Sequence, residues 1–491
     1  MSTWSVLIAN RGEIAMRIIR ACRDLDFRTV AVYSPVDRHA PHVALADAAY
    51  PLPGDAPGES YLNIDALIDV ARTAKAQAVH PGYGFLAENP AFAAACEHAG
   101  LRFVGPPPEV LGLCGDKARA REQIASAGVP VLAGTGPVGD EAAAAAAARI
   151  GFPLLIKAAG GGGGKGIHLV QKADELGATV RLARGEAKAA FGDDRIYLER
   201  WLAGARHIEV QIVADGVGRV VALGERECSI QRRHQKLIEE SPAPGLNALV
   251  RERMLEAAVA GARAIGYVNA GTWEFLLDGE AFYFLEVNAR LQVEHPITEL
   301  VASVDLVAEQ FRIVRGEGCS IDPGRLRISG HAIECRISAE DPHEGFLPST
   351  GRVEGVVEPG GPGIRVDSGL YAGMEVTRHY DPLLAKVIAW APSRGEAIAR
   401  MRRALSEMAM AGIASTIPFH RWALADPEFV AGNYTTQFLH RWDARTPDEA
   451  RERIAVLAAA AVTVLQMRTM RFPLGPSESV WVRAAREEGL R

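Results

Sequence analysis

Short apolar runs alternate with amphipathic helical patterns along the first 115 residues. The expected strands lie at 5–9, 29–33, 78–80 and 102–104, and the expected helices at 14–24, 64–74 and 91–99. An alternation of strands and helices predicts a parallel sheet with helices on both faces. We therefore expect an α/β domain that ends near residue 115, with a polar loop rich in His and Pro after its second strand.

The pattern changes after residue 115. Helices are expected at 116–127, 141–149 and near 173–190, and strands at 152–158, 167–170 and 196–200. We interpret this segment as a small insert with a two-strand core. From residue 206 strands dominate, at 208–214, 220–227 and 331–337, with helices at 248–265 and 303–315. This predicts an α+β domain that reaches about 445, followed by a tail with one helix at 447–467.

A hairpin around Asp278-Gly279 carries the most informative pattern in the chain. Its second arm has a polar residue at every second position: Glu286, Asn288, Arg290, Gln292 and Glu294. Alternate residues of an extended chain point to one side, and the other side here is apolar, so this polar strip is expected to lie over a core. Glu and Asn oxygens suit Mg²⁺ that bridges phosphates. A plain solvent-facing strand is the alternative.

The length of the hairpin loop decides whether Glu274, on the first arm, belongs to the same site. With a two-residue loop, Glu274 would pair with Tyr283 and face away from Glu286. We therefore predict a three-residue loop with Gly279 in the left-handed region, which puts both carboxylates on one face.

Composition narrows the class of protein. The 491 residues are too many for one hydrophobic core, and 48% hydrophobic with 23% charged residues is typical of a soluble globular protein. A net charge of −6 without a basic patch argues against a nucleic-acid partner. Six scattered cysteines without a C-x-x-C pair suit a reducing cytosol. The first residues do not resemble a signal peptide, and no apolar stretch is long enough to span a bilayer, so we expect a cytoplasmic protein.

A glycine run at 160–164 joins the strands at 152–158 and 167–170. It formally contains G-x-G-x-x-G, but a strand follows it instead of the helix that a Rossmann site requires. Gly166 also stands where a Walker A loop needs Ser or Thr. A glycine loop between antiparallel strands, with Lys157 on the entering strand, can close its amides over phosphates. A disordered linker is the alternative.

Four further clusters carry candidate chemistry. The basic segment 226–236 could bind oxyanions, although a solvated basic loop is equally consistent with it. The segment 331–337 alternates so that Glu334 and Arg336 point to one side. Lys117 opens a helix, where it could reach a nucleotide or be merely exposed. The turn 80–84, which contains Tyr83, follows a strand at the edge where open α/β sheets bind ligands, or it is a structural turn.

Together these residues resemble the biotin carboxylases of the ATP-grasp superfamily. The resemblance covers about residues 4–445, and its motifs at 9–13, 80–89, 160–166, 226–240 and 288–299 follow in the family's order. It implies an α/β and α+β multidomain fold. The implied parts are a Rossmann-like preATP-grasp domain (1–115), a linker helix (116–133), an ATP-grasp lid (134–203), an ATP-grasp core with the C-terminal biotin carboxylase region (204–445) and an extension (446–491). The lid is expected to close over ATP and its glycine run to be mobile without nucleotide.

The resemblance also implies a reaction and its residues. ATP and bicarbonate give carboxyphosphate, whose carboxyl group passes to biotin on another protein. The implied ATP contacts are Lys117, Lys157, Gly163, Gly164, Glu199, Arg200, Trp201, Leu202, His207, Gln231, His234, Glu274 and Glu286. Mg²⁺ or Mn²⁺ would bind Glu274, Glu286 and Asn288. Bicarbonate would bind Lys236, Arg290, Gln292, Val293 and Glu294. Glu294 would be the base, Arg336 would stabilise the biotin enolate, and Tyr83 would lie against biotin.

Two alternatives stay open at this point. One is another ATP-grasp ligase that makes an acyl phosphate, and the other is an inactive nucleotide-binding scaffold. The runs 226–236 and 292–295 speak against the first alternative. The second is opposed by the intact set Lys236, Glu274, Glu286, Arg290, Glu294 and Arg336. Ala289 departs from the family's Thr or Pro, but its side chain is expected to face away from the metal strip. No Met-Lys-Met biotinylation motif occurs in the sequence. We therefore expect biotin to arrive on a separate carrier protein, with a separate carboxyltransferase as a second partner and a homodimer as the assembly.

Overall fold

The computed structural model describes residues 4–159 and 166–443. Its N-terminal sheet is parallel, with strand order β3-β2-β1-β4-β5. The strands are β1 (Ser5–Ile8), β2 (Arg28–Tyr33), β3 (Ala48–Pro51), β4 (Ala78–His80) and β5 (Arg102–Phe103). The helices are α1 (Gly12–Asp24), α2 (Pro41–Leu45), α3 (Ile64–Thr73), α4 (Pro90–His98) and α5 (Pro108–Gly115). The predicted parallel sheet is confirmed. Strand β3 was missed because it lies at the sheet edge, within the segment expected to be a polar loop.

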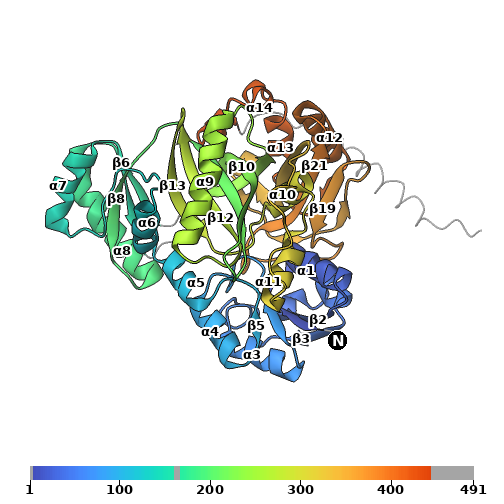
Figure 1. Ribbon diagram of the computed structural model, residues 1–491. Helices are drawn as coiled ribbons and strands as arrows, with labels where there is room; N and C mark the ends of the chain where they lie inside the picture. Colours follow the sequence, from blue (N-terminus) through green and yellow to red (C-terminus); the bar gives the residue numbers. More distant parts are fainter. Residues whose placement is uncertain (1–3, 160–165, 444–491) are drawn as a thin grey trace, which may run out of the picture. The chain divides into compact units, whose positions relative to one another are not determined.

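The second sheet belongs to the insert. Helix α6 (Lys117–Ser126) leads into it, with Asp116 as its N-cap and Lys117 as its first residue. The sheet is antiparallel, with order β7-β6-β8, so the expected two-strand core is wrong by one strand. Figure 1 shows it beside two helices. The elements are α7 (Asp140–Ile150), β6 (Leu154–Ala158), β7 (Ile167–Val170), α8 (Leu176–Phe191) and β8 (Ile196–Arg200).

An eight-stranded sheet forms the rest of the described fold, in the order β13-β12-β9-β10-β11-β14-β21-β19. Figure 1 shows α9 (Ala248–Ala264) lying along it. The strands are β9 (Arg206–Ala214), β10 (Val220–Arg232), β11 (Gln235–Ser241), β12 (Asn269–Asp278), β13 (Ala281–Asn288), β14 (His331–Ser338), β19 (Ile364–Ser368) and β21 (Leu383–Ala391). Nearly all residues of β9 and most of β10 are buried, the polar ones included.

Two helices stand where one was expected. The helix predicted at 303–315 is α11 (Leu306–Arg315), and α10 (His295–Ala302) precedes it. Helix α10 contacts β10, β11, β14 and β21. It was missed because the alternating polar residues suggested an extended chain as far as Glu294. In the structure β13 ends at Asn288, and Arg290, Gln292 and Glu294 lie in the loop and turn that lead into α10.

In the C-terminal part, helices pack on β11, β14 and β21. Its elements are α12 (Arg394–Glu407), β22 (Ala409–Ala411), α13 (Ile417–Ala423), α14 (Pro427–Ala431) and the short strands β15 (Glu340–Asp341), β16 (Leu347–Pro348), β17 (Gly351–Arg352), β18 (Gly355–Val357) and β20 (Glu375–Val376). The helix expected at 447–467 lies outside the described residues. Among the described helices, the length and apolarity needed to cross a bilayer are not found.

Candidate active site

A cleft of about 440 Å³ lies between the insert and the large sheet and collects most of the predicted site residues. Thirteen of them line it: Lys117, Lys157, His207, Gln231, His234, Lys236, Glu274, Glu286, Asn288, Arg290, Gln292, Val293 and Arg336. They come from helix α6 and from two sheets or their connections, and more than 200 positions of sequence separate Lys117 from Arg336. Such convergence of charged side chains in one cleft favours a binding or catalytic site over scattered surface polarity.

The hairpin β12–β13 places two carboxylates on this cleft by a route that differs from the prediction. Asp278 pairs with Ala281, so the loop has two residues, and the predicted three-residue loop is wrong. Gly279 does have a positive φ, of +60°. The register then shifts between Glu274 and Phe275, which leaves Leu285 as an extra residue and pairs Glu274 with Glu286. A β-bulge therefore does what the longer loop was expected to do.

The basic segment 226–236 is a second hairpin and not a loop. Strands β10 and β11 pair, and the turn residues Arg233 and His234 both have positive φ, as in a type I′ turn. Arg226 is fully buried and donates from Nη1 to Gln211 Oε1 and Thr298 Oγ1, at 2.8 Å each, and from Nη2 to Thr272 Oγ1 at 2.9 Å. It therefore braces the sheet against α10 and is not free to bind an oxyanion.

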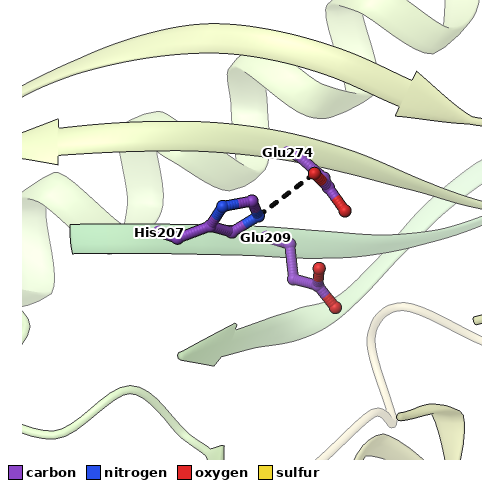
Figure 2. Close-up of side chains that lie close together, drawn as sticks. All are labelled: His207, Glu209 and Glu274. Carbon is purple, nitrogen blue, oxygen red and sulfur yellow. Dashed lines mark ion pairs between the residues drawn. The ribbon is translucent and has the colours of Figure 1, made fainter. Parts of the chain in front are cut away.

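Lys236 is the centre of the deepest part of the cleft. Its ammonium contacts the carboxylates of Glu209, Glu274 and Glu294, with 2.9 Å to Glu274 Oε1. Figure 2 shows Glu274 facing His207, whose Nε2 lies 3.1 Å from Glu274 Oε2. Burial would lower the pKa of Lys236, but these three carboxylates outweigh burial and raise it well above its usual value. Lys236 is therefore a fixed cation at the base of the cleft.

Glu209 was missed in the sequence. It is fully buried and is held between Arg226 and Lys236. Figure 2 shows it on the same strand as His207. The signal was present, because His207, Glu209 and Gln211 alternate in the otherwise apolar strand β9. Polar residues at every second position of a buried strand indicate a functional or structural network.

Three groups of residues could be considered for a metal ion. In one of them, Glu209, Cys228 and Glu294, the Lys236 ammonium contacts both acids. His207, Glu209 and Glu274 have ligand atoms within 4.8 Å of one another, but the Lys236 ammonium already contacts both of these acids. The predicted set, Glu274, Glu286 and Asn288, lines the cleft, and Asn288 Nδ2 donates to Glu274 Oε1 at 2.7 Å. Two carboxylates and an amide oxygen on adjacent strands fit a hard divalent cation. Lys236 contacts both acids of each deeper set but only Glu274 of the predicted set, so the predicted set offers the ion more ligands outside the contacts of Lys236.

Glu294, the predicted base, lies under the wall of the cleft and is fully buried. Its Oε1 contacts Lys236, and its Oε2 accepts from Arg336 Nη2 at 2.9 Å. Burial would raise the pKa of Glu294, but Lys236, Arg336 and Arg226 outweigh burial and hold that pKa well below its usual value. The group is thus a carboxylate at neutral pH, available to accept a proton.

Glu239 shares Arg336 with Glu294. Arg336 Nε lies 2.5 Å from Glu239 Oε1, and burial raises the pKa of Glu239 to about 7 although Arg336 opposes this. Two neighbouring buried acids therefore differ in protonation: Glu294 is ionised, and Glu239 is near the point of taking up a proton. Such separation of pKa values is characteristic of sites that transfer protons.

Arg290 is fixed by a residue of the N-terminal part that was not predicted. Its Nε donates to Glu88 Oε2 at 2.9 Å, and Glu88 Oε1 accepts from the Ala289 amide at 2.9 Å. Arg290 also donates to Gln292 Oε1 at 3.0 Å and to Asn288 Oδ1 at 3.1 Å. Ala289 is buried and is among the residues that line the cleft. Glu88 thus sets the loop that carries Arg290. It lies in the segment 80–89 that carries the family resemblance, but no role was predicted for it.

Apart from Glu294, the described predicted residues outside the lining of the cleft are Glu199, Arg200, Trp201, Leu202 and Tyr83. Lys157 contacts the buried carboxylate of Glu199 on β8, and Lys117 Nζ lies 2.5 Å from Glu286 Oε2. Arg200, Trp201 and Leu202 follow Glu199 and are exposed or half-buried. Tyr83 is half-buried, and its ring lies 5.7 Å below the ammonium of Lys386. Gly163 and Gly164 lie outside the described residues.

Comparison with known proteins identifies the family. The family model described as "Biotin carboxylase, N-terminal domain" matches residues 2–111, and "Biotin carboxylase C-terminal domain" matches 334–441. Between them, "Carbamoyl-phosphate synthase L chain, ATP binding domain" matches 116–321. A curated biotin carboxylase from Nostoc sp. is 50% identical over 437 residues, which are 88% of this chain and 98% of the relative. The chain belongs to the biotin carboxylase family.

Two further members of this biotin carboxylase family differ in name. A pyruvate carboxylase subunit from Methanothermobacter thermautotrophicus is 48% identical over 439 residues, 89% of each chain. The biotin carboxylase domain dimer of Hydrogenobacter thermophilus 2-oxoglutarate carboxylase matches with a TM-score of 0.87 and 45% identity, covering 90% of this chain and 98% of that one. That structure is described as a complex with MgADP, ADP and bicarbonate. A relative of this biotin carboxylase family member has thus been solved with nucleotide and bicarbonate bound.

Proposed function

We propose that this protein carboxylates biotin with ATP and bicarbonate through carboxyphosphate. The observation that carries the proposal is the buried, ionised Glu294, whose two oxygens contact Lys236 and Arg336 at the cleft wall. Bicarbonate is a poor nucleophile until a base removes its proton. Glu294 takes that proton, and the oxygen of the resulting carbonate attacks the γ-phosphorus of ATP as ADP leaves.

Bicarbonate binds among Lys236, Arg290, Gln292, Glu294 and the amide of Val293. Arg290 supplies a planar guanidinium whose position is fixed by Glu88, Asn288 and Gln292, which suits a planar oxyanion. Because the cleft is polar but partly closed, these donors are worth more here than in water. The Arg290 guanidinium, which faces the negative charge of bicarbonate, is thus held in position before the reaction begins.

ATP binds with its phosphates between Lys117, Lys157 and the carboxylates of β12 and β13. Glu274, Glu286 and Asn288 hold the divalent ion, which neutralises charge on the transferring phosphoryl group when bound. Glu199 to Leu202 take the adenine edge, His207, Gln231 and His234 line the nucleotide pocket, and Gly163 and Gly164 cover the phosphates.

Biotin binds at the side of Arg336 and Tyr83. Carboxyphosphate decomposes to CO₂ and phosphate. The released phosphate takes the proton of the ureido nitrogen of biotin, and this nitrogen then adds to the CO₂. Arg336 stabilises the enolate that forms on the ureido oxygen. Its guanidinium, with Glu239 on one side and Glu294 on the other, lies where the two half-reactions meet.

The proposal extends to organisation and partners. We propose that the chain divides into domains at 1–115, 134–203, 204–445 and 446–491, with a linker helix at 116–133, and that 134–203 closes over ATP. We further propose a cytoplasmic homodimer that works with a separate biotin carboxyl carrier protein and a carboxyltransferase.

Steady-state ADP release tests this function. With purified protein, Mg²⁺ and ATP, ADP release should need bicarbonate and should rise when free biotin is added. Ammonium, the nitrogen donor of carbamoyl-phosphate formation, should not stimulate it. ADP release that follows ammonium and ignores biotin would instead indicate another ATP-grasp ligase.

A further inference from the structure

Lys386 is not one of the predicted site residues, yet its side chain reaches the turn that carries the proposed base, Glu294. Its side chain is fully buried, and its Nζ donates to the carbonyl oxygen of Val293 at 2.8 Å. In the register of β14 and β21, Lys386 stands directly opposite Arg336. Arg336 holds the carboxylate of Glu294. Two opposed cations on neighbouring strands therefore hold consecutive residues of one turn, one by its backbone and one by its side chain.

Three further contacts fix Lys386 itself. Its Nζ lies 3.2 Å from Glu13 Oε1 on α1 and 3.8 Å from Asp367 Oδ2, and Asp367 is its partner in the register of β19 and β21. Its ammonium also lies 5.7 Å from the centre of the Tyr83 ring. Burial would lower the pKa of Lys386, but Glu13 and Asp367 outweigh burial and raise that pKa. Lys386 is thus a charged donor with a fixed direction.

His295 holds the preceding peptide of the same turn. Its Nδ1 lies 2.7 Å from the Gln292 carbonyl oxygen. Burial, with the cations Lys386, Arg17 and Arg365 nearby, lowers the pKa of His295 well below its usual value, so the ring is neutral. A neutral ring that faces a carbonyl must carry its proton on the facing nitrogen, which makes Nδ1 the donor.

The geometry of a trans peptide turns these two contacts into a statement about bicarbonate. The C=O and N–H of a trans peptide point in opposite directions. The Gln292 carbonyl points to His295, so the Val293 amide on the same peptide points away from His295. Val293 lines the cleft. The Val293 carbonyl oxygen accepts a hydrogen bond from Lys386. This contact fixes the Val293–Glu294 peptide, which leads into the Cα atom that carries the Glu294 side chain.

From these contacts we propose that Lys386 and His295 are positioning residues for bicarbonate. Lys386 fixes the Val293–Glu294 peptide and His295 fixes the Gln292–Val293 peptide, so that the Val293 amide and the Glu294 carboxylate face one bicarbonate. This inference rests on the proposed function. Because Lys386 also contacts Glu13 of the N-terminal part and lies over Tyr83, it ties the bicarbonate turn to the side on which biotin is placed.

Lys386→Met tests the first arm, because Met has a similar length and no donor. The KM for bicarbonate should rise about 10-fold or more, as expected for the loss of a charge-assisted hydrogen bond, while the affinity for ATP stays within about twofold. Lys386→Arg, which keeps a cationic donor, should recover part of the loss. Glu13→Gln is the matched control, since it changes an ion pair of Lys386 and leaves the Val293 contact in place.

Two variants of His295 test the positioning proposal independently, including the case in which Lys386→Met does not fold. His295→Phe keeps a ring without a donor, and His295→Asn keeps an N–H close to the position of Nδ1. The first should raise the KM for bicarbonate, and the second should restore it.

Equal bicarbonate KM values in the Phe and Asn variants, or a Lys386→Met enzyme with the wild-type bicarbonate KM, would overturn the inference. A wild-type enzyme whose ADP release ignores bicarbonate would instead overturn the proposed function.

Discussion

Replacing Glu294 by Gln separates the proposed base from every other feature of the site. The change keeps the size and shape of the side chain and removes its charge. Lys236 keeps two carboxylate partners, Glu209 and Glu274, and Arg336 keeps Glu239. Neither cation is therefore left bare. Glu294→Gln should lower the free energy of unfolding by about 1–3 kcal/mol, because the new amide N–H group faces another buried donor, Lys236 or Arg336.

The expected effect on catalysis is larger. A general base contributes about 10²–10⁴-fold, which corresponds to about 3–5 kcal/mol of activation free energy. The assay is bicarbonate-dependent ADP release, with the affinity for ATP measured separately by equilibrium binding. Glu294→Gln should lose about 10²-fold or more in kcat for ADP release and bind ATP normally.

Glu334→Gln is the matched control. Glu334 is as buried as Glu294 and stands opposite Glu239 in the register of β11 and β14. Neither of its carboxyl oxygens has a hydrogen-bond partner among the described residues. Burial raises the pKa of Glu334 well above its usual value, so its replacement by Gln exchanges one neutral group for another. Its activity should stay near that of the wild type. Equal losses in the two variants, or a Glu294→Gln enzyme with more than about a tenth of wild-type kcat, would refute the reasoning.

Three further predictions concern other parts of the fold. Arg336→Ala should reduce biotin carboxylation at least about 10-fold more than biotin-independent ATP hydrolysis, because Arg336 acts on the biotin enolate; equal losses of both activities contradict that role. Arg226→Met should lower the free energy of unfolding by about 3–5 kcal/mol, measured by chemical denaturation, because it leaves Glu209 buried with one cation fewer; an unchanged midpoint would show that Arg226 does not brace the sheet. Burial would raise the pKa of Glu240, but His331 and Arg394 lower it to about 2 from the usual 4.5, so its stabilisation is full above pH 4.5 and is lost as the pH falls towards 2. Glu240→Gln should therefore remove about 3 kcal/mol at pH 7 and less at pH 3, and an equal loss at both pH values contradicts this.

Sequence patterns predicted most of the architecture because they report burial directly. The alternation of strands and helices over the first 115 residues indicated the parallel sheet, and Lys117 begins α6 as its N-terminal position suggested. The polar residues at 286–294 do meet at one cleft, with Glu294 beneath its wall. They do so partly as a strand and partly as a loop, which a rule of alternation cannot distinguish.

The features that could not be predicted depend on contacts between distant segments. The bulge at Leu285 has no local marker, because neither Gly nor Pro stands near it in the strand. The turn Arg233-His234 lacks the Gly or Asn typical of its type, so its charge suggested a loop. Glu88 and Lys386 matter through contacts 202 and 93 positions away, to Arg290 and Val293. Such partners become visible only when the chain is folded.

The most direct test of the central claim is transfer of label from ¹⁴C-bicarbonate to biotin. The purified protein is incubated with Mg²⁺, ATP, ¹⁴C-bicarbonate and free biotin, and acid-labile ¹⁴C that co-elutes with biotin is measured against ADP. Labelled carboxybiotin should form only when ATP and biotin are both present, and Glu294→Gln should abolish it. Cleavage of ATP by the wild type in the presence of bicarbonate and biotin, with no label on biotin, would contradict the account.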